Sequence, residues 1–165
     1  REYHIQGCSD YDARRFTNAL VDFQKSCELG SDVQDYSCYR IWLIRARMGQ
    51  QKAATQELQT YLEHRHQQQP GDWPLQVGRF LLGQLPESDF IKAADDANVR
   101  TSAEQHCEAY FYAGSKRLID GNKMGAIDFF KRCLATNETT FEEYQSAASE
   151  LLFLETPRPE SSSAK

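Results

Sequence analysis

A pair of residues recurs along this chain at a nearly constant interval, and it constrains the fold more than any other feature. In each copy, a small residue is followed four positions later by a large apolar one. The three copies are Ala19 with Phe23, Ala54 with Leu58, and Ala126 with Phe130. The first two alanines are 35 residues apart, and the next interval of 72 is two steps of 36. Because residues i and i+4 share one face of a helix, this period predicts a stack of helical hairpins.

Capping and breaking signals divide the chain into helices of similar length. Gly30 suits the left-handed end of a helix, and Asp72 with Pro74 suits a helix start. Capping boxes predict further starts at 31–34, 101–104 and 140–143. No window shows the alternation of a strand flanked by hairpin turns. The sequence therefore predicts an all-α chain, with helices near 2–13, 16–28, 33–48, 51–66, 73–82, 86–97, 103–119, 123–135 and 141–154.

Glycine and aromatic positions add to the repeat. Gly7 and Gly114 suit the small residue of a first helix, and Tyr110 stands four positions before Gly114. This pattern resembles the tetratricopeptide repeat (TPR), whose units are about 34 residues long. Residues 108–151 are also similar to the last repeat and terminal helix of bacterial TPR proteins, some of which are exported lipoproteins. The third unit, 73–98, fits poorly, because its Gly83 and its alanine pair are out of register.

The resemblance implies the architecture of the whole chain. We expect a right-handed α-solenoid of about four helix hairpins, TPR-like, with a C-terminal capping helix. Residues 1–155 are expected to form a single helical repeat domain. Residues 156–165 contain two prolines and a run of serines, so they have nothing to bury and are predicted to be a disordered tail.

Charge and hydropathy exclude several classes of function. The 165 residues carry 19 Lys and Arg against 24 Asp and Glu, a net charge of −5. This acidic balance argues against nucleic-acid binding. No apolar run approaches the roughly 20 residues that a membrane-spanning helix needs. Because the chain begins at Arg1 and not at Met, removal of an export signal or lipid anchor stays open. A periplasmic or exported location is favoured over a cytoplasmic one.

The expected concave groove supplies the functional prediction. Stacked hairpins line such a groove with the first helix of each pair. In the second unit, this helix carries Tyr and Arg side chains along one face, and both types are enriched at binding hot spots. An Arg cluster suits an acidic segment or a carboxylate terminus. The predicted partner-binding residues are Tyr36, Tyr39, Arg40, Leu43, Arg47, Arg79 and Phe111. The same stripe could instead be a solvated face that packs between repeats.

We therefore predict a non-catalytic protein–protein interaction module, a scaffold or adaptor that holds a peptide or partner protein and needs no cofactor. One alternative is a metal- or thiol-dependent enzyme that uses His64 and His66 or the region of Cys107. Residues one or two apart on a helix diverge, however, so neither the two histidines nor the His106–Cys107 pair converge there. The other alternative is a structural, self-associating module of a larger assembly.

Five cysteines remain to be placed. In an antiparallel hairpin, Cys107 at the start of one helix and Cys133 at the end of the next lie side by side. Cys27 and Cys38 flank a turn in the same way, so Cys8 is the one cysteine that this pairing leaves without a cysteine partner. Two readings stay open. The pairs could be bridged in an oxidising compartment, or all five could be reduced packing residues.

Overall fold

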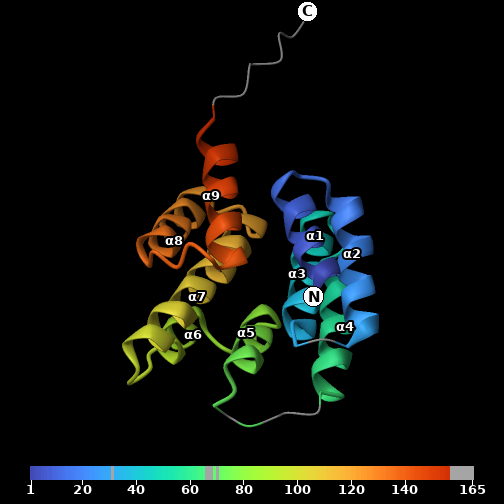
Figure 1. Cartoon of the computed structure of the whole chain (residues 1–165), viewed down its shortest axis with the longest axis horizontal. Coiled ribbons are helices and arrows are strands. Elements are labelled where there is room, and N and C mark those ends of the chain that lie inside the picture. Colours follow the sequence, from blue (N-terminus) through green and yellow to red (C-terminus); the bar gives the residue numbers. More distant parts are fainter. Residues whose placement is uncertain (31, 66–68, 70, 157–165) are drawn as a thin grey trace, which may run out of the picture.

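The computed structural model describes residues 1–30, 32–65, 69 and 71–156. Within these ranges the chain forms nine α-helices and no strand, which confirms the predicted all-α class (Figure 1). The helices are α1 (Glu2–Asp12), α2 (Phe16–Leu29), α3 (Gln34–Arg47), α4 (Gln51–Glu63), α5 (Trp73–Leu81), α6 (Glu87–Ala93), α7 (Val99–Ile119), α8 (Lys123–Ala135) and α9 (Glu142–Glu155). Apart from Thr156, the predicted tail lies outside the described residues. No helix in these ranges is long and apolar enough to cross a membrane.

Consecutive helices pack as hairpins, as expected of a TPR-like solenoid. Contacts run in sequence order through α1 to α4 and again through α7 to α9, with α5 between the two groups and α6 packed against α5 and α7 (Figure 1). Two hairpins are centred on a glycine against a phenylalanine ring. A Cβ added at Gly7 would lie 2.8 Å from Phe23, and one at Gly114 would lie 2.8 Å from Phe130. The recurring large residue thus fills the space that the small residue of the neighbouring helix leaves.

The third unit keeps the period, contrary to the sequence interpretation. Gly78 stands 36 positions before the corresponding glycine of the last unit, and a Cβ there would lie 2.8 Å from Leu62. Phe90 and Ala94 stand 36 positions before the last small–large pair, so their order is exchanged. Both are fully buried, and the Phe90 ring stacks on Phe80 with centroids 4.2 Å apart. The motif of this unit fits the repeat poorly because the large residue comes first.

Several helix ends differ from the sequence prediction. Asn98 caps α7, where its Oδ1 accepts hydrogen bonds from the backbone N–H groups of Arg100 and Thr101 at 3.0 and 3.2 Å. The capping box expected at 101–104 is therefore wrong, because Thr101 already lies inside the helix. Helix α6 is shorter than predicted and ends at Ala93. Helix α4 ends at Glu63, so the last residues of the predicted 51–66 helix are not helical or lie outside the described residues.

The last helix reaches back to the first. Helix α9 packs against α1 and α7 as well as against its neighbour α8. The Ser149 hydroxyl donates to the carbonyl oxygen of Asp12 at 2.8 Å, across the α1–α9 contact. The terminal helix therefore covers the inner side of the helix stack, where the sequence analysis expected an open groove.

Candidate functional site

Arg40, in the middle of α3, occupies the centre of the inner face. Its guanidinium is completely buried. Nη1 donates to the Ser146 hydroxyl at 3.0 Å, and Nη2 lies 3.4 Å from Oε1 of Glu143, both on α9. The guanidinium also lies 4.3 Å from the ring centroid of Phe111 and 5.0 Å from that of Tyr11. A buried charge needs such partners, because an unpaired one would be strongly destabilising.

A second buried ion-pair cluster lies one heptad further along the same two helices. Glu150 of α9 is almost fully buried, and its carboxylate lies 2.6 Å from Arg47 and 2.6 Å from Arg14. The Tyr11 hydroxyl donates to the same carboxylate at 3.1 Å. Burial alone would raise the pKa of Glu150, but the two guanidinium groups hold it below its ordinary value. The carboxylate is therefore ionised at neutral pH and joins three helices.

The acidic segment expected to bind the Arg stripe is thus part of the chain itself. Arg40 and Arg47 are seven residues apart, and so are Glu143 and Glu150, which they meet. This matched spacing is visible in the sequence, although local patterns alone do not pair the two sets. Four predicted residues are completely buried by helices of the same chain, so the expectation that they line an open groove is wrong. They are Tyr39, Arg40, Leu43 and Phe111.

The remaining predicted residues keep part of their surface. The Tyr36 hydroxyl donates to Oε2 of Glu108 at 2.7 Å, and Trp73 Nε1 donates to the same oxygen at 2.7 Å. Burial, with the nearby charge of Glu143, raises the pKa of Glu108 to about 8. Sequence reasoning missed this carboxyl, although an acid within the apolar run 107–114 signals a buried partner. Arg79 lines a separate cavity of about 340 Å³ between α4 and α5.

The residues of the enzyme alternative are dispersed. His64 is exposed, with Nδ1 2.8 Å from the carbonyl oxygen of Thr60, and His66 lies outside the described residues. Cys107 is fully buried, whereas its neighbour His106 faces Asp95 at 3.5 Å. The part of the chain that the structure describes contains no cluster of three or more His, Cys, Asp or Glu side chains that could hold a metal ion.

Both predicted cysteine pairs are brought together, as free thiols. The Sγ atoms of Cys107 and Cys133 are 3.5 Å apart, and those of Cys27 and Cys38 are 3.1 Å apart. Cys8 is buried away from both pairs, with its sulfur 3.6 Å from the ring of His4. Whether either pair is ever bridged stays a prediction.

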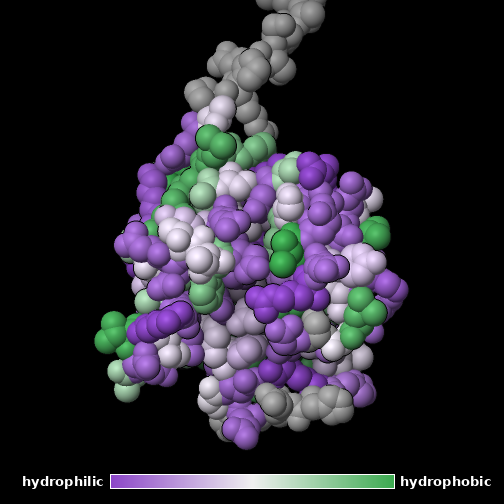
Figure 2. Space-filling view, viewed as in Figure 1, coloured by the Kyte–Doolittle hydropathy of each residue, from purple (hydrophilic) through white to green (hydrophobic). Residues whose placement is uncertain are grey.

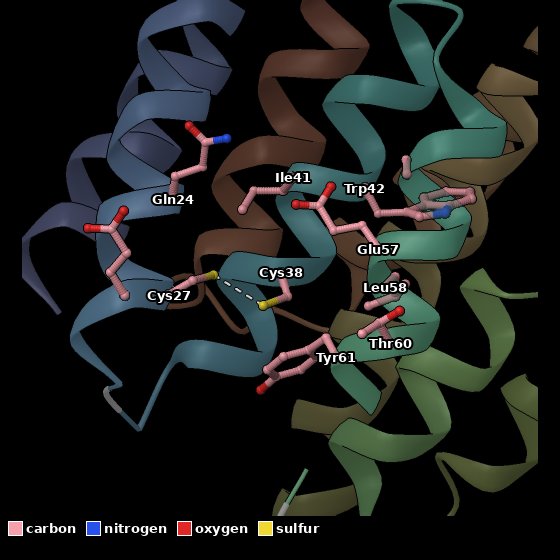
Figure 3. Close-up of a pocket in the computed structure, with 11 residues that line it drawn as sticks. Gln24, Cys27, Cys38, Ile41, Trp42, Glu57, Leu58, Thr60 and Tyr61 are labelled. Carbon is pink, nitrogen blue, oxygen red and sulfur yellow. Dashed lines mark hydrogen bonds between the residues drawn. The ribbon is translucent and has the colours of Figure 1, made fainter. Parts of the chain in front are cut away.

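An outer groove lies between α2 and α4, with α3 as its floor (Figure 3). Its cavity of about 550 Å³ is open to solvent. Ile41, Trp42 and Leu58 line it but are 7% exposed or less. The apolar side chains that keep part of their surface there are therefore Cys27, Cys38 and Tyr61. Polar residues stand around these side chains: Gln24, Glu28, Glu57 and Thr60. Such a groove can receive an apolar side chain with polar groups beside it.

The face viewed in Figure 2 is largely hydrophilic. Hydrophobic residues are scattered over it (Figure 2). In α9, Leu152 is 72% exposed and Phe153 is 43% exposed. Isolated apolar residues of this kind are normal on a protein surface. The outer groove, with its cavity of about 550 Å³, is therefore the candidate docking site.

Comparison with known proteins finds a bacterial relative. The chain is 30% identical over 153 residues to the lipoprotein NlpI homolog of Haemophilus influenzae. The match covers 90% of this chain but 46% of that protein, so the chain spans about half the length of the curated relative it matches. No protein-family model matches the chain. The chain is thus similar to a bacterial lipoprotein, and its all-helical structure is consistent with a TPR-like α-solenoid.

Proposed function

We propose that the chain is a non-catalytic protein-interaction module, a scaffold or adaptor that holds a segment of a partner protein in the outer groove. The observation that carries this proposal is the solvent-open cavity, in which Cys27, Cys38 and Tyr61 keep part of their apolar surface. The inner face does not serve, because α9 covers the buried arginine Arg40.

The groove favours a partner segment with an apolar side chain flanked by Lys or Arg. Two carboxylates, Glu28 and Glu57, stand at its rim. Each is now paired, Glu28 with Lys25 at 3.1 Å and Glu57 with Arg45. Both carboxylates are at least half exposed, and such surface ion pairs contribute about 0–1 kcal/mol to stability. A basic residue of a partner can therefore take the place of Lys25 or Arg45 in these pairs. The net charge of −5 would also speed encounter with a basic segment.

Site-specific photocrosslinking in cells that make the protein tests this proposal. A benzoylphenylalanine at Gln24 or Thr60 lies at the groove, and we expect both positions to crosslink the same partner. Asn18 on α2 and Gln56 on α4 are matched controls, because both are exposed and neither lines the cavity. Equal crosslinking from the control positions, or a crosslink from them alone, would contradict docking in the groove.

Two substitutions then measure the affinity for the partner so identified. Gln24→Arg and Thr60→Arg each place a bulky cation at the groove, and we expect each to weaken binding at least tenfold. Asn18→Arg adds the same charge on the same helix as Gln24 and should leave affinity unchanged. If the groove variants and the control weaken binding equally, the effect is one of charge and the groove is not the docking site.

Two subsidiary proposals follow from the earlier expectations. We propose Arg79 as a secondary partner contact, because it is partly exposed beside a second cavity. We also propose an exported, lipid-anchored location for the whole protein, which the name of the relative supports. Cell fractionation of the full-length protein tests the location, and recovery in the cytosolic fraction would contradict it. A crosslink to a second copy of the chain would favour the self-association alternative instead.

A further inference from the structure

Two cysteines face each other at one end of the outer groove (Figure 3). Cys27 lies in the last turn of α2 and Cys38 in the second turn of α3, and their Sγ atoms are 3.1 Å apart. The turn between them is held by Gln34, whose Nε2 donates to the carbonyl oxygen of Cys27 at 3.0 Å. Because a disulfide bond is about 2.05 Å long, a small rotation of the two side chains brings the sulfurs to bonding distance.

The two cysteine pairs differ in how a reagent could reach them. Cys27 and Cys38 are half-buried, and both line the solvent-open cavity of about 550 Å³. Cys107 and Cys133 are completely buried between α7 and α8, with sulfurs 3.5 Å apart. Thiol–disulfide exchange requires direct attack on a sulfur atom, so accessibility decides which pair reacts.

We propose that Cys27 and Cys38 form a reversible dithiol–disulfide site that reacts with a low-molecular-weight disulfide, whereas Cys107 and Cys133 stay reduced in the folded protein. This inference is independent of the docking proposal, because the reaction of the two thiols does not require a partner segment to be bound in the groove.

The exchange proceeds in two balanced steps. The thiolate of Cys27 attacks one sulfur of the reagent RS–SR, forms a mixed disulfide and releases RS⁻. The thiolate of Cys38 then attacks the Cys27 sulfur, closes the intramolecular bond and releases the second RS⁻. The two cysteine protons end on the two released thiols, and the cysteine sulfurs pass two electrons to the reagent. The hydrogen bond with Cys27, together with burial, raises the pKa of Cys38, which is why the first attack is assigned to Cys27.

Peptide mapping after equilibration with glutathione disulfide tests the proposal on the folded chain. Both cysteines fall in one tryptic peptide, residues 26–40, because no Lys or Arg lies between Lys25 and Arg40. We expect this peptide to lose two hydrogens and to resist alkylation until a reductant is added. Cleavage after Tyr36 should leave its two halves linked. Cys107 and Cys133 should be alkylated only after denaturation, each as a free thiol.

Single-cysteine variants separate the steps. In Cys38→Ser the second attack cannot occur, so we expect a stable glutathione adduct on Cys27. In Cys107→Ser, which leaves the outer pair intact, the bond in peptide 26–40 should form as in the wild type. Circular dichroism verifies that each variant is folded. The proposal is overturned if peptide 26–40 keeps two free thiols after equilibration, if the adduct never closes in the wild type, or if the buried pair oxidises equally fast.

Discussion

Glu150 offers the sharpest test of how α9 is held on the inner face. The substitution Glu150→Gln keeps the shape of the side chain but removes the charge that pairs with Arg47 and Arg14, each 2.6 Å away. Breaking a buried pair by removing one partner costs about 3–5 kcal/mol, because the other charge stays buried. Arg14 keeps 23% of its side chain exposed and can turn to water, whereas Arg47 keeps 12%. We therefore expect a loss near the lower limit, about 3 kcal/mol.

Urea and thermal unfolding followed by circular dichroism measure this loss. For a chain of this size, about 3 kcal/mol corresponds to a fall in Tm of about 6–12 °C. The double variant Arg47→Met with Glu150→Gln should be less destabilised than the sum of its single changes, because it no longer buries an unpaired guanidinium. Glu155→Gln is the control on the same helix, since its pair with Lys131 is exposed and should contribute less than about 1 kcal/mol.

The contribution of Glu150 to the stability of the fold decreases as the pH falls. The folded-state pKa of Glu150 lies below its ordinary value of 4.5, so its stabilisation is present above that pH and is lost as the pH falls through the folded-state pKa. The stabilities of the wild type and Glu150→Gln should therefore converge in acid. A loss below about 1 kcal/mol at pH 7, or an equal loss in Glu155→Gln, would refute the reasoning that a buried charge holds α9.

Three further predictions concern the rest of the chain. Glu108→Gln should stabilise the fold at pH 8 and leave it unchanged near pH 4.5. The carboxyl of Glu108 has a pKa of 4.5 in the unfolded chain and about 8 in the folded chain, so the wild type loses about 1.4 kcal/mol of unfolding free energy per pH unit between these values. Urea unfolding of both proteins at pH 4.5 and pH 8 measures this difference. Phe90→Ala should cost about 3–5 kcal/mol if the third unit has a packed core, against less than about 0.5 kcal/mol for the exposed Val99→Ala. Closing the Cys27–Cys38 bond should stabilise the chain by about 3 kcal/mol through loop entropy, and calorimetry with and without reductant should detect the higher Tm.

The helical repeat could be predicted because its signal is local and periodic. Ala19 with Phe23 and Ala126 with Phe130 mark hairpins in which a glycine of the neighbouring helix accepts the large ring. The third unit was predicted from its length although its motif fits poorly, because Phe90 takes the place of the small residue. A motif defined as a small residue followed four positions later by a large one does not match a unit in which the large residue comes first, even though the two residues pack in the same way.

The site was predicted less well, because groove exposure is a long-range property. Local pattern placed Arg40 and Arg47 on one face of α3, and it assigned them an acidic partner of the right chemistry. The local pattern could not show that the partner is α9, which lies about a hundred residues away along the chain. Contact between α3 and α9 depends on the curvature of the whole helix stack. The equal spacing of Glu143 and Glu150 is the clue that the sequence holds. The cysteine pairs were foreseen because each flanks a single turn or hairpin.

Native-state hydrogen exchange tests the central claim most directly, namely that α9 is a permanent part of the inner face. The amides of Ala147 and Leu151 in α9 should exchange only through global unfolding, with the same free energy as those of Leu43 and Ile44 in α3. If the α9 amides exchange at a much lower free energy while the α3 amides stay protected, the helix detaches by itself. The arginine face would then be open to a partner, and the account given for this face would be wrong.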